Sequence, residues 1–249
     1  MPTAFPPDFA DMLAPGAARR IARHAGALAS APAGEAGFLS LASCLSPEAC
    51  ARGLAALEAT MLPLLSRIDV PIPAATIWSQ TRSFQERLPK VARLRTAYLE
   101  RRGTRAWHAA DEIGVLDLLR SPGLREFGEA LAGRRLKPGA GCQVLCYGAG
   151  DYMGPHHDHH PDIPGARDGY LDIHLGFSTP SVGSQRLVHA RDGHLSQVVE
   201  LARPGLVNAY RLPFWHQVAP LEPRRGADPA AARRWVLLAS FRFARRVAP

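Results

Sequence analysis

The stretch Leu171-Asp-Ile-His-Leu-Gly-Phe177 alternates large apolar residues with small or polar ones. Successive side chains of a β-strand point to opposite faces, so this period of two predicts a strand with one packed face. The other face carries Asp172 and His174, and we expect it to face a cavity or solvent. The stretch therefore favours a sheet that packs on one side only.

Short β-rich runs of this kind fill the second half of the chain, separated by Gly, Pro and Asp turns. They begin near residues 142, 153, 170, 186, 196, 206, 214 and 234. About eight short strands with this spacing are typical of an antiparallel sandwich or barrel. Together with the helices expected before them, they predict an α+β fold whose C-terminal half is a double-stranded β-helix, or jelly roll, braced by N-terminal helices.

The first half of the chain contains helix-start signals. Ser46-Pro47-Glu48 and Ser121-Pro122 each place a capping residue before a proline at the first helical position. The second of these helices is expected to stop at Gly133, since glycine commonly ends a helix. Residues 84–101 and 111–119 also look helical.

Length and composition indicate one main folding unit. A chain of 249 residues with 47% hydrophobic content can bury one substantial core. Residues 1–36 are rich in Ala, Pro and Gly without sustained periodicity, which predicts a flexible or loosely docked arm. Residues 37–249 are predicted to form a single catalytic domain, with 37–138 as mainly helical support and 139–249 as the jelly-roll core.

The net positive charge of the chain is large, but it says little about the partners of the protein. The formal net charge is +8, but Lys90 and Lys137 are the only lysines, so arginine carries nearly all the positive charge in a chain also rich in Ala, Gly and Pro. We attribute this bias to the base composition of the genome, and we do not expect nucleic acid as a partner. The four cysteines are poorly placed for disulfides, and no apolar run approaches the length of a membrane span. We therefore expect a cytoplasmic protein that does not interact with membranes.

Two histidines and one aspartate have the layout of a metal site. The segment from Tyr147 to Asp158 reads Tyr-Gly-Ala-Gly-Asp-Tyr-Met-Gly-Pro-His-His-Asp, and His216 follows in Leu-Pro-Phe-Trp-His-Gln-Val. Two imidazoles and a carboxylate on one face of an iron ion leave the opposite positions open for O2 and a cosubstrate. A structural zinc site would instead use all four positions. We predict that His156, Asp158 and His216 are metal ligands and catalytic residues.

The register of the His-x-Asp pair is ambiguous, because the segment contains both His156/Asp158 and His160/Asp162. The first pair is favoured because it follows a strand-like segment directly, whereas His160 precedes a proline that indicates a loop. The roles of four further histidines stay open: His157, His159, His160 and His174.

The ordered set of residues resembles the Fe(II)/2-oxoglutarate-dependent dioxygenase superfamily, in particular its prolyl-hydroxylase-like branch. That pattern places a Tyr before a Gly-x-Tyr run, then His-x-Asp, a Gly-led strand, a distal His and an Arg that opens the next strand. The matching residues are Tyr147, Gly150-Asp151-Tyr152, His156-x-Asp158, the strand led by Gly205, His216 and Arg234.

The resemblance implies a cofactor and a reaction. His156, Asp158 and His216 would bind Fe(II), which 2-oxoglutarate would chelate, with O2 as the second cosubstrate. Arg234 would form a bidentate pair with the distal carboxylate of 2-oxoglutarate, and Tyr147 would hydrogen-bond the same molecule. The implied activity is hydroxylation of an unactivated C–H bond, coupled to oxidative decarboxylation of 2-oxoglutarate to succinate and CO2.

Two arginines compete with Arg234 for the role of carboxylate partner. A Pro/Arg/Ala/Asp-rich insert over residues 221–233 separates His216 from Arg234, so Arg225 or Arg233 could take that role instead. The eight-residue spacing from Arg234 to Arg242 does not match the nucleic-acid demethylase branch. We therefore expect a small-molecule or amino-acid-derived substrate. The alternative is a cupin-like jelly-roll metal-binding protein or metalloenzyme that does not use 2-oxoglutarate. The oligomeric state cannot be predicted.

Overall fold

The computed structural model of the chain describes residues 3–29, 37–72, 88–158, 169–191, 194–212 and 215–244. Over these residues eleven strands form one antiparallel sheet, in the order β1-β10-β6-β13-β4-β3-β5-β11-β8-β9, with β2 paired to β3. The strands are β1 (Phe38–Leu41), β2 (Ser66–Pro71), β3 (Val91–Tyr98), β4 (Gly141–Gly148), β5 (Tyr152–His156), β6 (Tyr170–Ser178), β8 (Arg186–Arg191), β9 (His194–Glu200), β10 (Val207–Arg211), β11 (His216–Val218) and β13 (Arg233–Arg242). A short ladder joins β7 (Val182–Ser184) to β12 (Glu222–Pro223).

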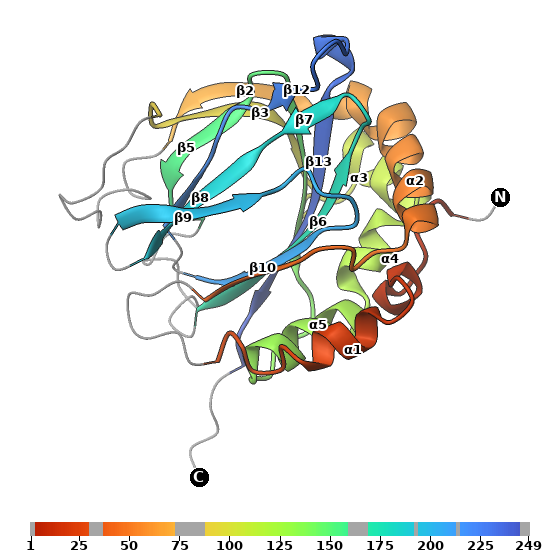
Figure 1. Cartoon of the computed structure of the whole chain (residues 1–249). Coiled ribbons are helices and arrows are strands. Elements are labelled where there is room, and N and C mark those ends of the chain that lie inside the picture. The colour runs from red at the N-terminus through yellow and green to blue at the C-terminus, as the bar shows by residue number, and fades with distance from the viewer. Residues whose placement is uncertain are drawn as a thin grey trace.

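The sheet curls into a nearly closed barrel with two walls. One wall is β10-β6-β13-β4 and the other is β5-β11-β8-β9, and β3 bridges them because it pairs with both β4 and β5. Figure 1 shows these walls curving around a common interior. The predicted double-stranded β-helix is therefore confirmed.

Strand β6 has the two faces that its sequence predicts. Its apolar side chains Leu171, Ile173, Leu175 and Phe177 are each at most 3% exposed and belong to the core beneath the helices. Asp172 and His174 point the other way and line the interior cavity. Strand β13 alternates in the same way, so the central wall separates an apolar core from a polar-lined lumen.

Helices cover the outer face of this wall on one side of the molecule (Figure 1). They are α1 (Ala17–Ala22), α2 (Pro47–Ala56), α3 (Arg105–Glu112), α4 (Val115–Arg120) and α5 (Pro122–Ala132), with α2 continued by η2 (Leu57–Met61) and η3 (Leu62–Leu64). The helices predicted to start at Ser46 and Ser121 are confirmed. Each serine accepts a hydrogen bond from a backbone N–H of the first turn, and α5 ends at Gly133 in the left-handed conformation.

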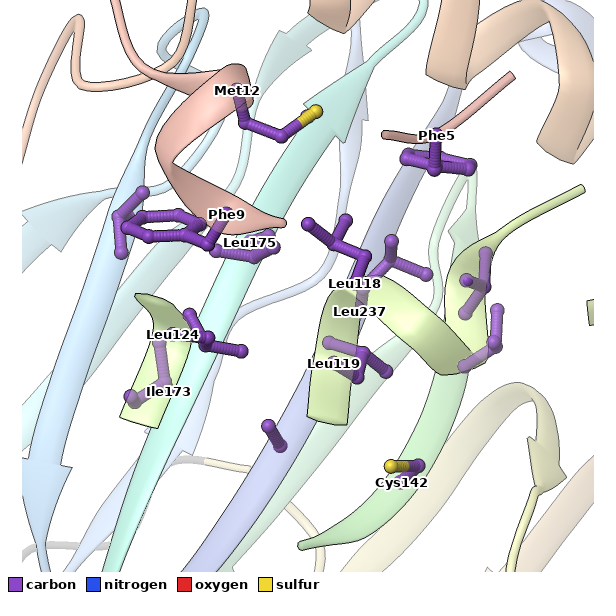
Figure 2. Close-up of a cluster of buried hydrophobic side chains, with 14 of the residues drawn as sticks. Phe5, Phe9, Met12, Leu118, Leu119, Leu124, Cys142, Ile173, Leu175 and Leu237 are labelled. Atoms are coloured by element: carbon purple, nitrogen blue, oxygen red, sulfur yellow. The ribbon is translucent and has the colours of Figure 1, made fainter. Parts of the chain in front are cut away.

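Figure 2 shows how the helices and the sheet share a core. Leu118, Leu119 and Leu124 from the helices meet Ile173, Leu175 and Leu237 from β6 and β13. All six of these side chains are 0% exposed. The helices pack against the outer face of the wall, and the inner face lines the barrel cavity, where a site can form.

The helix predicted within residues 84–101 is wrong, because Val91–Tyr98 is strand β3. Its burial alternates with a period of two, and Leu94 and Thr96 are buried while Arg95 is exposed. Pairing with β2, β4 and β5 satisfies its backbone groups through partners distant in sequence, which local helix propensity does not register. Residues 37–138 were predicted to be mainly helical support. They contain three strands, β1, β2 and β3, besides the helices.

Residues 3–29 are packed rather than loose. Phe5, Phe9 and Met12 are at most 1% exposed and lie in the helix–sheet core (Figure 2). Asp8 accepts hydrogen bonds from the backbone N–H of Ala10 in η1 (Phe9–Met12) and of Gly123 in α5. Widely spaced single aromatics give no periodic signal, which is why composition alone suggested a loose arm.

No helix in the described ranges is both long and apolar enough to cross a membrane.

Candidate metal centre

The barrel contains a partly open cavity of about 910 Å³. The lumen faces of β13, β6 and β4 form one wall, and β5, β11 and β8 contribute to the other. A cavity of this volume matches those that hold small organic ligands.

Three predicted ligands meet inside this cavity. Strand β5 ends at His156, Asp158 follows two residues later, and His216 opens β11, which pairs with β5 so that the two histidines are cross-strand partners. Their ligand atoms all lie within 4.8 Å of one another. Asp158 lies 3.1 Å from Nε2 of His156 and 3.7 Å from Nε2 of His216. Ligands held about 2.1 Å from a metal at right angles lie about 3 Å apart, so the spacing suits one shared ion.

His156 is oriented for coordination by its own strand. Its Nδ1 lies 2.7 Å from the carbonyl oxygen of Gly154, so Nδ1–H donates there and Nε2 keeps its lone pair. Gly154 is packed closely against the segment before β3, because a Cβ at this position would lie 2.0 Å from the carbonyl oxygen of Pro89. A glycine is therefore required where the strand positions its candidate metal-ligand histidine.

A hydrogen-bond network fixes Asp158 from the opposite side. The hydroxyl of Tyr210 donates to Asp158 Oδ2 at 2.7 Å and lies 2.9 Å from Nε2 of His174. Tyr210 gives its one proton to Asp158, so it accepts from His174 Nε2–H. Burial lowers the pKa of His174 and, with the nearby Asp158 charge, raises that of Tyr210 well above its usual range. Both groups therefore stay in the forms that this network needs.

Asp158 is held as a carboxylate. Burial alone would raise its pKa, but the adjacent His216 and His156 and the hydrogen bond from Tyr210 outweigh burial and hold the pKa well below its usual range. An ionised carboxylate beside two imidazoles is the donor set that non-haem Fe(II) sites use. The residues present therefore fit an Fe(II) ion.

Arg234 supplies a buried positive charge to the same cavity. It is 4% exposed, its Nε donates to Oε1 of Gln185 at 2.5 Å, and its guanidinium lies 4.8 Å from the centre of the Tyr147 ring. No acidic side chain within the described ranges forms an ion pair with it. Burial lowers the pKa of Arg234, because the charged guanidinium loses its hydration. A buried cation with only neutral partners indicates an anionic ligand.

Tyr147 lies against the same arginine, and burial raises its pKa to about 12. Its hydroxyl therefore keeps its proton near neutral pH and can donate a hydrogen bond to an anion in the cavity.

The two competing arginines lie elsewhere. Arg233 points to the outer face of β13, where its Nε donates to both carboxylate oxygens of Glu58, at 2.9 and 2.7 Å. Arg225 is exposed on the loop before η5 (Pro229–Ala231) and does not line the cavity. Of the three candidates, only Arg234 faces the cavity.

The other histidines divide into three cases. His174 and His157 both line the cavity. His174 hydrogen-bonds Tyr210, and the ring centre of His157 lies 5.2 Å from that of Trp215. The alternative ligand pair, His160 and Asp162, lies outside the described residues, and so does the neighbouring His159.

Sequence reasoning did not identify Gln185 or Tyr210. Gln185 follows the short strand β7 and is 1% exposed, with its amide nitrogen also donating to the carbonyls of Asp151 and Ala219. No motif marks a lone glutamine of this kind. Tyr210 carried a weak signal, since it lies on the Gly-led strand that the motif places before the distal histidine.

Comparisons with known proteins give a likeness of structure. No protein-family model matches the sequence, and no curated protein matches it. The chain is similar to a prolyl 4-hydroxylase structure from Phytophthora capsici, with 15% identity, a TM-score of 0.53, and coverage of 94% of this chain and 65% of that one. Two more distant likenesses have TM-scores below 0.5. A 2OG-Fe(II) oxygenase family structure from Burkholderia pseudomallei has 15% identity and a TM-score of 0.49, and the match covers 84% of this chain and 88% of that one. A Pseudomonas putida prolyl-4-hydroxylase structure has 16% identity and a TM-score of 0.47, and the match covers 84% of this chain and 92% of that one.

At this level of identity the likeness concerns the fold. It agrees with the resemblance that the ordered motif indicates and with the position of the triad inside the barrel. The chain thus has the double-stranded β-helix fold of the prolyl-hydroxylase-like Fe(II)/2-oxoglutarate oxygenases.

Proposed function

We propose that the chain is a non-haem Fe(II) oxygenase that hydroxylates a small organic substrate and converts 2-oxoglutarate to succinate and CO2. The observation that carries this proposal is that one cavity contains both a two-histidine, one-carboxylate cluster and a buried arginine without an acidic partner among the described residues. The first can hold a metal ion, and the second suits the distal carboxylate of a metal chelator.

Each residue has a part in this proposal. His156, Asp158 and His216 hold Fe(II), which supplies the oxidative chemistry when bound. Arg234 binds the distal carboxylate of 2-oxoglutarate through its two Nη groups, since Gln185 occupies its Nε. Tyr147 donates to the same molecule.

The experiment is to measure succinate release from 2-oxoglutarate with Fe(II) and O2, for the wild type, His216→Ala and Arg234→Met. Release that needs Fe(II) and falls to background in both variants is the expected result. A metal-dependent activity that ignores both 2-oxoglutarate and Arg234→Met would instead favour the cupin-like alternative.

A further inference from the structure

Gln185 lies behind the cavity wall, between the arginine and the strands that present the metal-ligand histidines. It directly follows β7 and is 1% exposed, but it does not line the cavity. A side chain in this position touches no ligand, so any effect that it has on the site is transmitted through the residues that it bonds.

The amide of Gln185 has one possible orientation. Its Nε2 donates to the carbonyl oxygens of Asp151 and Ala219, at 3.2 and 3.1 Å, and its Oε1 accepts from Nε of Arg234 at 2.5 Å. Carbonyl oxygens only accept and a guanidinium only donates, so a reversed amide would face a like group at every contact. Both polar atoms of the side chain are therefore committed.

The three partners belong to the three elements that carry the candidate site. Asp151 immediately precedes β5, the strand that ends at His156. Ala219 immediately follows β11, the strand that begins at His216. Arg234 lies on β13 in the opposite wall. One amide thus joins the arginine to both histidine-bearing strands.

The backbone of Gln185 is fixed as well. Its N–H donates to Oε1 of Glu200 at 3.0 Å, and its carbonyl accepts from the N–H of Leu201 at 2.7 Å. A side chain anchored at both its backbone and its amide has little freedom to follow a movement of Arg234. The amide therefore acts as a fixed support for the arginine.

This support sets where the guanidinium points. The guanidinium is planar and rigid, so holding Nε fixes the direction of the two Nη groups. The ring of Tyr147, 4.8 Å from the guanidinium carbon, restricts tilting out of that plane. The separation between the Nη groups and the His156, Asp158 and His216 cluster is then constant, and a chelator that reaches both has to match it in length.

We infer that Gln185 is a positioning residue that fixes the distance from Arg234 to the metal-ligand cluster, and that it thereby selects 2-oxoglutarate over a 2-oxo diacid of different length. This inference rests on the proposed function, because it takes the cluster and Arg234 as the two ends of one cosubstrate site. The residue holds its neighbours in place and takes no part in the chemistry.

The test measures binding without turnover, by calorimetric titration of the Fe(II)-loaded protein under anaerobic conditions. The first probe is 2-oxoglutarate and the second is 2-oxoadipate, which is longer by one methylene. The third probe is 2-oxobutanoate, which has the chelating end but no distal carboxylate. The wild type should bind 2-oxoglutarate at least about tenfold more tightly than 2-oxoadipate, the lower end for one methylene in a fitted site. This comparison needs no variant, so it stands even if a substitution at Gln185 prevents folding.

Gln185→Met removes the support and keeps a side chain of similar length. Its affinity for 2-oxoglutarate should fall about tenfold to a hundredfold, the effect of losing a hydrogen bond to a charged group that orients a ligand. Its affinity for 2-oxoadipate should change by less than about threefold, because a freed guanidinium can adjust to a longer chain. Binding of 2-oxobutanoate should be unchanged, since that probe does not reach Arg234.

Gln217→Met is the matched control. Gln217 is also a buried glutamine, 8% exposed on β11, but it neither lines the cavity nor bonds Arg234. The same substitution there should leave the affinities for all three probes, and the preference for 2-oxoglutarate, as in the wild type.

Failure of this inference is distinguishable from failure of the proposed function. If 2-oxoglutarate binds the wild type but 2-oxoadipate binds equally well, or if Gln185→Met keeps the full preference, Gln185 does not select length and the oxygenase proposal stands. A loss of 2-oxobutanoate binding in Gln185→Met would mean that the residue supports the whole site, and it would also overturn the inference. If the wild type does not bind 2-oxoglutarate at all, both are overturned.

Discussion

The guanidinium of Arg234 is 4% exposed and donates to the neutral amide of Gln185, while its neighbour Arg233 pairs with Glu58 on the opposite face of the same strand. Adjacent residues of one strand thus have opposite environments. A structural arginine is expected to have an acidic partner, as Arg233 does. Arg234 has none in the described part of the chain, which supports the proposal that it binds an anionic ligand.

This difference predicts opposite effects of one substitution at the two positions. Arg234→Met should weaken 2-oxoglutarate binding at least about thirtyfold, the cost of removing one partner of a buried charge pair. Its free energy of unfolding should fall by no more than about 1 kcal/mol, because a desolvated cation is replaced by an apolar chain of similar length. Calorimetric titration and urea unfolding measure the two quantities.

Arg233→Met is the control for that prediction. It removes the ion pair with Glu58, whose other partner is the indole N–H of Trp235, so stability should fall by about 1–3 kcal/mol while 2-oxoglutarate affinity is unchanged. Equal losses of affinity in both variants would mean that Arg234 acts only through the fold.

Tyr210 is predicted to position a metal ligand without touching the metal. Tyr210→Phe removes the hydrogen bond to Asp158 Oδ2 and should weaken metal binding about tenfold to a hundredfold. Tyr152→Phe, on the strand that ends at His156 but outside the cavity lining, should leave metal affinity unchanged. Titration with Co(II), followed by visible absorption, compares them, and equal affinities for Tyr210→Phe and the wild type would contradict the role.

At the scale of single elements, the cap of α5 also anchors the N-terminal segment. The hydroxyl oxygen of Ser121 accepts from the backbone N–H of Leu124 and from that of Phe9, each at 3.2 Å. Ser121→Ala should therefore cost about 2 kcal/mol of unfolding free energy, the upper end for a helix cap. Ser46→Ala removes a cap that accepts only from Ala49 among the described backbone groups and should cost about 1 kcal/mol. Urea unfolding of both variants checks the difference, and equal losses would show that the Phe9 contact contributes nothing.

Elements with local signals could be predicted, and those that depend on distant partners could not. The serine and proline at the start of α2 and α5 and the alternation of β6 are encoded within a few residues. Strand β3 is specified by pairing with β4, about fifty residues away, and with β5, about sixty residues away, and local sequence patterns do not register such distant partners. Predicting this strand would have required knowing that β4 and β5 each need a pairing partner.

The site shows the same division. His156, Asp158, His216 and Arg234 follow an ordered motif that is visible in the sequence, and the structure brings them to one cavity. Gln185 and Tyr210 contribute single side chains whose role appears only when β10 and the segment after β7 reach the lumen. Sequence reasoning therefore misses the residues that orient Asp158 and Arg234.

At the scale of the whole molecule, buried thiols predict a loss of stability at high pH. Burial raises the pKa of Cys44 and Cys142 from 9.0 to about 11 and that of Cys146 to about 12. Above pH 9 these thiols ionise in the unfolded chain but stay protonated in the folded protein. The unfolded state then binds fewer protons, so stability falls as pH rises from 9 to about 11.

The variant Cys146→Ala isolates one thiol. Each such group steepens the fall by about 1.4 kcal/mol per pH unit, so the variant should lose stability with pH less steeply by that amount between pH 9 and 11. Urea unfolding at several pH values gives the two slopes. Identical slopes would show that Cys146 ionises at the same pH in both states.

The central claim is that one cavity holds Fe(II) on His156, Asp158 and His216 and 2-oxoglutarate on Arg234. The most direct measurement is the visible absorption of the protein with Fe(II) under anaerobic conditions, before and after addition of 2-oxoglutarate. A charge-transfer band that needs both additions, and that is lost in His216→Ala and weakened in Arg234→Met, is the predicted result. Bound Fe(II) with no new band at saturating 2-oxoglutarate would contradict it.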